Sequence, residues 1–72
     1  MHLCEVDIRR RLGSNLRRLR TERGLSQEAF ADLANIHRTY VSDIERGARN
    51  PTVIVVERLA LALGIRAGEL LD

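Results

Sequence analysis

The sequence predicts a compact all-α fold of five helices in one domain spanning residues 1–72. Apolar residues recur at helical spacing in several segments, beginning with Ile8, Leu12, Leu16 and Leu19. Residues that favour helix starts and ends separate these segments, and no segment alternates as a strand does. Because 72 residues bury only a limited core, we expect marginal stability without a partner subunit.

The first predicted helix runs from about Asp7 to Arg23. Asp7 is suited to cap its N-terminus or to lie in its first turn. Gly24 provides a left-handed stop directly after the helix. Gly13 lies inside the helix, where it either lowers stability or permits close packing against a neighbour.

The second predicted helix is short and begins after Ser26, which is suited to cap it. Its buried face is expected to consist of Phe30, Leu33 and Ala34. Ala31 is small enough to allow close contact with another helix.

A three-residue turn, 35–37, leads into the third predicted helix, which covers about residues 38–46. Asn35 tolerates the positive φ that such a turn often needs. Val41 and Ile44 are expected to point inward, with Ile36 helping from the turn. The opposite, outward face carries Arg38, Thr39, Ser42, Asp43 and Arg46.

Gly47 is expected to end the third helix. Thr52 then caps a fourth helix that runs to about Leu63 and stops at Gly64, and a last short helix covers about residues 66–71. Five residues of the fourth helix suffice to face the core: Val53, Val56, Leu59, Ala60 and Leu63.

All twelve basic residues are arginines, and the net charge is +2. Residues 1–23 carry seven arginines and three acids, whereas residues 24–50 carry three arginines and four acids. Arginine binds phosphates and guanine edges bidentately, so the composition suits nucleic acid. The groups at 9–11 and 17–18 are equally consistent with phosphate contact and with a solvated helix face.

Several classes of protein are disfavoured. With one cysteine, Cys4, and two histidines, His2 and His37, the chain has no disulfide and no metal-spacing pattern, so no metal or cofactor is expected. No phosphate loop or nucleophile elbow indicates an enzyme. The longest apolar run is too short for a membrane, and a signal-peptide layout is missing, so we expect a cytoplasmic protein. Cys4 is then a packed or disordered terminal residue or, as an alternative, a redox sensor.

Residues 12–71 resemble the helix-turn-helix family of phage lambda-type repressors and Cro, also called the XRE family. The resemblance implies a lambda-repressor-like fold and sequence-specific binding to double-stranded DNA, usually as a dimer. Asn35 and His37 depart from it, because glycine and a serine or threonine cap are usual there. The matching residues are Leu16, Arg17, Arg20, Leu25, Ser26-Gln27-Glu28, Leu33-Ala34, Val41, Ile44-Glu45-Arg46-Gly47, Arg49, Pro51, Leu59-Ala60, Ala62-Leu63-Gly64 and Leu70.

A narrower resemblance is to the controller proteins of restriction-modification systems. It is carried by Arg38-Thr39-Tyr40-Val41-Ser42, with Ile44-Glu45-Arg46 and Arg49-Asn50 following. Those controllers are small free-standing dimers of about this length.

The family resemblance also implies roles for single residues. Arg20 and Glu45 match a buried salt bridge that ties the first helix to the end of the third. Gln27 matches a residue that meets a phosphate at a helix N-terminus, although a plain polar first-turn residue is the alternative. The expected phosphate contacts are Gln27, Arg17, Arg46 and Arg49.

The helix-turn-helix covers about residues 26–46, so the outward face of its second helix is expected to meet bases in the major groove. Arg38 is suited to grip guanine, and Thr39 to meet a thymine methyl or a phosphate. Tyr40, by the controller resemblance, lies against DNA near the dimer axis, or else packs half-buried. Asp43 accepts from cytosine, orients Arg38 or a neighbouring arginine, or repels wrong sequences. Ser42 completes the expected base-contacting set.

The helices at about 52–71 are the expected dimerisation helices. Ile54, Val55 and Leu61 are apolar beyond what the core needs, and an exposed apolar strip on a small protein indicates a partner surface. The alternative is a wider core covered by the last helix or the N-terminal segment. The expected dimer interface is Ile54, Val55, Arg58, Leu61 and Ile65.

The sequence therefore predicts a homodimeric transcriptional regulator on a palindromic operator, with its two reading helices about 34 Å apart. RNA polymerase is a further expected partner of an activator, with Glu28 and Asp32 as candidate contacts. One alternative is a protein-interaction module of the antitoxin-like kind. Another is a scaffold domain of a larger chain, against which Met1 and the end just after the last helix argue.

Overall fold

The computed structural model describes the backbone of residues 4–72 and the side chains from residue 8 onward. Within the described residues there are five helices and no strand, which confirms the predicted all-α fold. None of these helices is long and apolar enough to cross a membrane. The helices are α1 (Cys4–Glu22), α2 (Gln27–Ala34), α3 (Arg38–Glu45), α4 (Val53–Leu63) and α5 (Ala67–Leu71).

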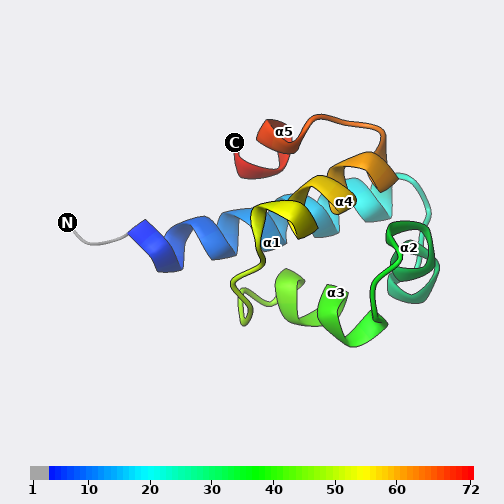
Figure 1. Ribbon diagram of the computed structural model, residues 1–72, viewed down its shortest axis with the longest axis horizontal. Coiled ribbons are helices and arrows are strands. Elements are labelled where there is room, and N and C mark those ends of the chain that lie inside the picture. Colours follow the sequence, from blue (N-terminus) through cyan, green and yellow to red (C-terminus); the bar gives the residue numbers. More distant parts are fainter. Residues whose placement is uncertain (1–3) are drawn as a thin grey trace.

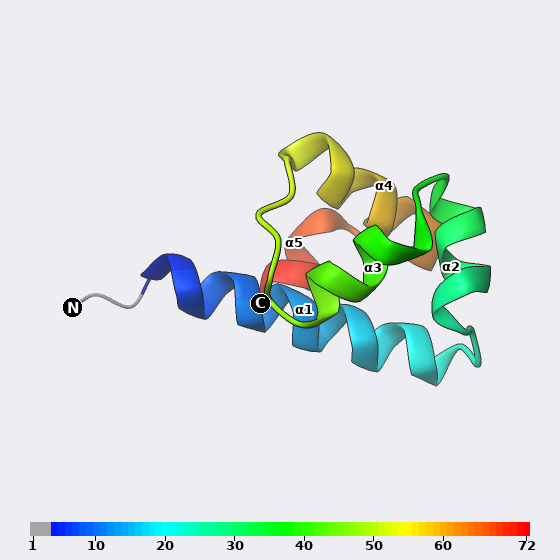
Figure 2. The same cartoon turned by 90° about the horizontal axis from the view of Figure 1, so that it is seen from below.

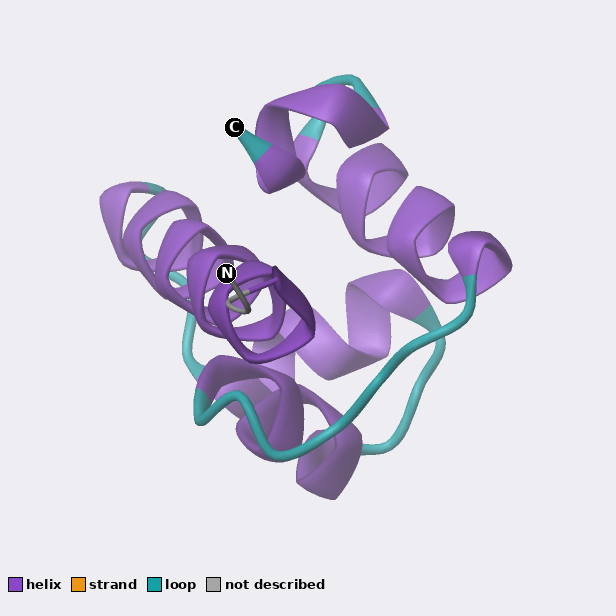
Figure 3. Ribbon diagram, turned by 90° about the vertical axis from the view of Figure 1, so that its left-hand side faces the viewer, coloured by secondary structure: helices purple, strands orange, loops and turns teal. Residues whose placement is uncertain are grey.

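The long helix α1 is the axis on which the other helices are arranged. It packs against α3 on one side and α5 on the other, while α2 packs against both α3 and α4. Figure 1 shows α3 below α1 and α5 above it, and Figure 2 shows the first turns of α1 extending past the rest of the molecule. In the end-on view of Figure 3, the helices surround a common centre.

That centre is an apolar core to which every helix contributes. Burying a Leu, Ile, Val or Phe side chain contributes about 1.5–3 kcal/mol relative to leaving it exposed. The largest fully buried side chains are Leu16 from α1, Phe30 from α2, Val41 and Ile44 from α3, Leu59 from α4 and Leu70 from α5.

Several residues predicted to start or end helices have the hydrogen bonds or backbone conformations that such positions require. The Ser26 and Thr52 hydroxyls accept the backbone N–H groups of the third residue of α2 and of α4, respectively. Asn35 has the left-handed conformation, with φ of 60°. Gly24 and Gly64 also have positive φ, at 69° and 73°. Ser26 and Asn35 fix where α2 begins and ends, and Thr52 and Gly64 do the same for α4.

Four predicted helix boundaries differ from the structure, one of them the end of α1, which lies at Glu22 and not at Arg23. Helix α1 begins at Cys4, so Asp7 lies inside the helix and does not cap it. Helix α3 ends at Glu45, with Arg46 as its C-cap, and α5 begins after Arg66. The apolar period that located the first helix starts only at Ile8, which explains the late predicted start. The prediction for the Cys4 side chain lies outside the described side chains.

Two residues predicted to be buried are exposed, namely Leu33 (60%) and Val53 (82%), and Ile8 of the apolar stripe on the first helix is 38% exposed. Helix α2 packs through Phe30, Ala31 and Ala34, which span an arc of about 100° that leaves Leu33 outside. Val53 is the first residue of α4, ahead of the point where the helix meets the core.

Candidate nucleic-acid interface

Helix α3 begins with a histidine cap. The Nδ1 atom of His37 accepts the backbone N–H of Thr39 at 3.0 Å, as a serine or threonine hydroxyl does elsewhere. Because an imidazole nitrogen accepts only when it carries no proton, this cap needs a ring that is unprotonated at Nδ1. The cap was not predicted, although the residue's position directly before the helix was a sufficient signal.

The inner face of α3 is fixed by the core and its outer face is open. Val41 and Ile44 are buried, as predicted. Arg38 and Thr39 are exposed in the first turn, while Tyr40, Ser42 and Asp43 are partly buried. The outward residues predicted from the helical period therefore do lie on the solvent side of α3.

Asp43 is the centre of an exposed ionic cluster, which we call the Asp43 cluster (Tyr40, Asp43, Arg46 and Arg49). Its Oδ1 atom accepts from Nη2 of Arg46, and its Oδ2 atom accepts from Nη2 of Arg49 at 3.0 Å. The guanidinium of Arg49 also lies 4.5 Å from the centre of the Tyr40 ring. Of the roles predicted for Asp43, orienting neighbouring arginines is the one present in this structure, and the arginines are not Arg38.

The electrostatics of this cluster favour the ionised carboxylate. The hydrogen bond from Arg49 lowers the pKa of Asp43 most, and Arg46 lowers it further, against an opposing effect of desolvation. Asp43 therefore stays charged at neutral pH. Two predicted phosphate contacts, Arg46 and Arg49, are thus already engaged with an acid when no DNA is present.

A second arginine–carboxylate group lies two residues further along α3 but is buried, and we call it the Glu45 hub (Arg20, Gln27 and Glu45). Arg20 Nε donates to Glu45 Oε2 at 2.6 Å, and Arg20 Nη2 donates to Oε1 at 3.1 Å. Arg20 Nη1 also donates to the Leu25 carbonyl at 2.7 Å. The expected Arg20–Glu45 salt bridge is present, and it ties α1 to the end of α3.

Gln27 belongs to this hub through its side chain. Its Nε2 atom donates to Glu45 Oε1 at 3.0 Å. Gln27 is also the first residue of α2, where a backbone N–H has no acceptor within the helix. The side chain is therefore held by Glu45, while the backbone N–H lies at the end of α2 that favours an anion.

Helix α1 touches the end of α3 at Gly13. A Cβ added there would lie 2.7 Å from the Glu45 carbonyl oxygen, closer than real Cβ atoms come. Of the two predicted explanations for Gly13, close packing is therefore confirmed. Only a residue without a side chain allows α1 to cross α3 at this distance.

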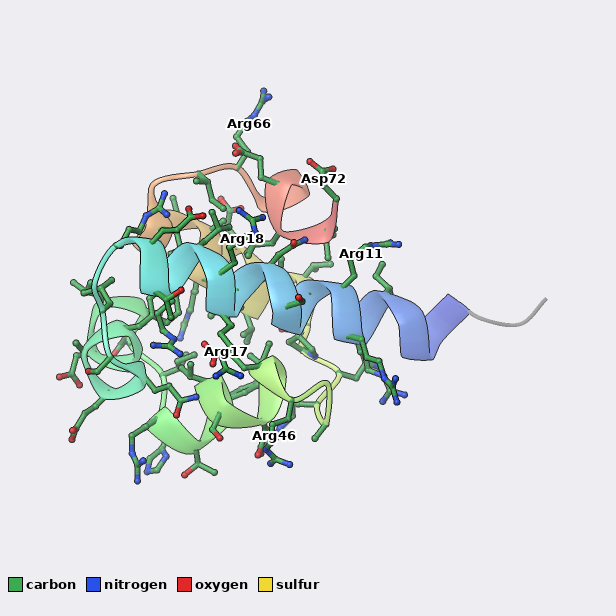
Figure 4. All side chains as sticks on the ribbon, turned by 180° about the vertical axis from the view of Figure 1, so that it is seen from behind. Arg11, Arg17, Arg18, Arg46, Arg66 and Asp72 are labelled. Atoms are coloured by element: carbon green, nitrogen blue, oxygen red, sulfur yellow. The ribbon has the colours of Figure 1, made fainter. Side chains whose placement is uncertain are left out.

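The N-terminal arginines separate into two groups by direction. Arg10 packs beside Gly47, just after α3, and Figure 4 shows Arg17 on the α3 side of α1. Arg11 instead donates to the Leu71 carbonyl at 3.0 Å, and Arg18 pairs with Glu22 at 3.7 Å. Arg10 was not among the predicted site residues, although its spacing from Gly13 and Arg17 puts all three on one helical face.

The expected dimer surface on α4 is partly confirmed as exposed. Ile54 and Leu61 are 65% and 69% exposed, and Arg58 is exposed as well. Val55 packs partly against the core, so counting it as surplus to the core was wrong, and Ile65 of the expected interface also packs partly against the core. Leu33 joins the surface from α2, because a shallow pocket is lined by Leu33, Ala34, Asn35, Arg58, Leu61 and Ala62.

Comparison with known proteins supports the helix-turn-helix interpretation. A helix-turn-helix family model matches residues 16–70. The HTH-type transcriptional regulator y4dJ of Sinorhizobium fredii, itself uncharacterised, is 48% identical over 65 residues, covering 90% of this chain and 84% of that protein. The control protein C.BamHI of Bacillus amyloliquefaciens is 42% identical over 67 residues, covering 92% and 83%.

A solved structure extends this similarity to three dimensions. The restriction-modification controller protein C.AhdI from Aeromonas hydrophila matches with a TM-score of 0.84 at 45% identity, covering 86% of this chain and 94% of that one. The order of helices, the exposed face of α3 and these relatives agree. The chain belongs to the helix-turn-helix family of DNA-binding transcription regulators.

Proposed function

We propose that this regulator acts as a homodimer that recognises a palindromic operator through α3. The observation that carries the proposal is the contrast between the two faces of this helix. Val41 and Ile44 anchor the inner face in the core, while Arg38 and Thr39 are exposed in the first turn. In a helix-turn-helix, the N-terminal residues of the second helix contact base edges in the major groove.

Base readout is then assigned to the outward residues of α3. Arg38 has the reach and the paired donors for a guanine, and Thr39 has a methyl group for thymine. Tyr40, Ser42 and Asp43 lie on or beside the same face. Phosphate contacts are assigned to Gln27, Arg17, Arg46 and Arg49, and the position of Arg10 beside Gly47 adds it to this group.

The dimer is assigned to the exposed apolar residues of α4. Leu61 lines one pocket with Arg58 and with Leu33 of α2, and the exposed Ile54 shares the face of Arg58 and Leu61 by helical spacing. A twofold dimer would cover this surface and would repeat α3 once per helical turn of DNA.

The relatives suggest a more specific role. C.AhdI is a restriction-modification controller by name and C.BamHI is named a control protein, so we propose that this chain regulates a restriction-modification system. If it activates transcription, the exposed acids Glu28 and Asp32 of α2 are the candidate contacts with RNA polymerase.

The first test is selection of bound duplexes from a random pool, with wild type and Arg38→Ala side by side. The proposal predicts a palindromic site for wild type and lost preference at one symmetric pair of positions for the variant. Salt-sensitive binding with no enriched sequence would contradict it, and would favour a module that binds protein.

The second test is sedimentation equilibrium of Leu61→Glu. A charge in the proposed interface should shift the protein toward monomer, whereas Val53→Gln, at an apolar residue that is 82% exposed outside this surface, should not. A dimer that survives Leu61→Glu but dissociates with Val53→Gln would move the interface to the start of α4.

A further inference from the structure

Asp43 is a carboxylate on the face of α3 that is proposed to approach a polyanion. We propose that Asp43 is a specificity-determining residue, because it holds Arg46 and Arg49 in one geometry and so limits them to phosphates in one register. The inference rests on the proposed operator recognition. It concerns discrimination between sequences and not the existence of DNA binding.

Both oxygens of the Asp43 carboxylate are engaged by arginine side chains. Each oxygen of Asp43 accepts from a different guanidinium, Oδ1 from Arg46 and Oδ2 from Arg49. The Asp43 side chain is only 19% exposed, whereas the arginines remain about half exposed or more. Arg49 is further restrained by the ring of Tyr40, which packs against the core. The cluster is therefore anchored to the fold and open to solvent at the same time.

Both arginines keep donors for a second partner. A guanidinium has five N–H groups, and each contact with Asp43 involves the Nη2 atom alone. An arginine can therefore stay hydrogen-bonded to Asp43 and still donate to a phosphate, provided that the phosphate lies within hydrogen-bond distance of its remaining N–H groups.

This restriction affects specific and non-specific DNA differently. Non-specific affinity comes almost entirely from phosphate contacts, which form in many registers along the duplex. A mobile arginine can contact a phosphate in any register along the duplex. An arginine held by Asp43 contacts a phosphate in one register only, or must first break its hydrogen bond with Asp43. On the operator, base contacts by Arg38 and Thr39 already set a single register. Asp43 therefore lowers non-specific affinity more than operator affinity, and specificity is that difference.

The chain offers a matched control in the Arg18–Glu22 pair. Glu22→Gln, like Asp43→Asn, removes one negative charge and releases an exposed arginine from an acid. Arg18, however, extends from the side of α1 that faces α5, opposite to Arg17 (Figure 4). The control separates a general effect of net charge from an effect of the Asp43 cluster.

The experiment measures binding of wild type, Asp43→Asn and Glu22→Gln to two duplexes over a series of salt concentrations. One duplex carries the selected operator, and the other is a scrambled sequence of the same length and composition. For Asp43→Asn, affinity for the scrambled duplex should rise roughly threefold or more, with the salt slope steeper by about 1, as expected for one further phosphate contact. Operator affinity should change less, so the ratio of the two affinities falls.

The contrary outcomes are equally defined. An equal change on both duplexes, or no difference between Asp43→Asn and Glu22→Gln, overturns the role of Asp43. A selection that returns no operator overturns the proposed function itself, which is a separate result. Asp43→Ala repeats the test with a strong helix former, so a folding defect of one variant does not decide the outcome.

Discussion

The Asp43 cluster and the Glu45 hub use the same chemistry on the same helix, two residues apart, with opposite consequences. In the hub, the Glu45 side chain is 4% exposed and its carboxylate accepts from Arg20 and Gln27. In the cluster, Asp43 binds two arginines whose outer atoms face solvent. Burial gives the first group a structural role, whereas exposure leaves the arginines of the second group able to donate to a further partner while they remain on Asp43.

The difference shows that burial decides whether an arginine–carboxylate pair on this helix supports the fold or faces solvent. Removing one partner of a buried pair leaves an uncompensated charge, whereas exposed pairs are screened by water and salt. The helical period decides which case applies. Glu45 follows the buried Ile44 at the end of α3, while Asp43 lies toward the outward side.

The largest expected effect is at the hub. Glu45→Gln should lower the free energy of unfolding by about 3–5 kcal/mol, because Arg20 then remains buried without a counter-charge. Asp43→Asn should change stability far less. Urea denaturation followed by circular dichroism measures both, and equal losses for the two variants would contradict the distinction.

The next largest effect concerns the contact between Gly13 of α1 and the backbone of α3 at the Glu45 hub. Gly13→Ala places a methyl group against the Ile44 and Glu45 carbonyls and should cost about 1–3 kcal/mol of stability, since backbone cannot easily move away. Gly68→Ala in α5, where a Cβ meets open space, should be neutral or stabilising. Thermal melting compares the two, and a neutral Gly13→Ala would mean that α1 and α3 are less tightly packed.

On the exposed face the expected effect is on DNA binding alone. Arg38→Ala should cost about 1–3 kcal/mol of discrimination at its base and leave the melting temperature unchanged, because Arg38 is exposed. Isothermal titration with the operator and a single-base variant measures this. A loss of melting temperature with unchanged discrimination would assign Arg38 to the fold.

The smallest expected effect is a change in the pKa of Asp43. Hydrogen bonding to Arg49 holds the pKa of Asp43 below its ordinary value of 3.8. The cluster is therefore intact at neutral pH, and its contribution to stability is lost only as pH falls below that value. NMR titration should show this pKa rising in Arg49→Ala, and rising less in Arg46→Ala. An Asp43 pKa that neither variant changes would mean that the ion pairs do not persist in solution.

Sequence reasoning located the helices and the outward face of α3 because both depend on local signals. Ser26, Thr52 and Asn35 act through their own backbone neighbourhood, and the helical period placed Val41 and Ile44 inside. The prediction for Leu33 was wrong because burial depends on which arc of a helix its neighbours cover. The prediction for Val53 was wrong because α4 meets the core only beyond its first residue.

The partners of Asp43 show a second limit. Arg46 lies three residues further along and follows helical spacing, so that contact was within reach of the sequence. Arg49 lies beyond the end of α3, and its return to Asp43 and Tyr40 depends on the path of the loop after Gly47. Arg20 and Glu45 are separated by 25 positions and were identified only through the family resemblance.

The most direct test of the central claim is an NMR map of backbone amide shifts on adding the selected operator. If the exposed face of α3 reads DNA while the Arg20–Glu45 pair only supports it, the largest changes should fall on residues 38–43, on the loop at 46–49 and on Gln27. Amides of α5 should move little. The largest changes on α4 and α5, with α3 unaffected, would contradict the proposed recognition surface.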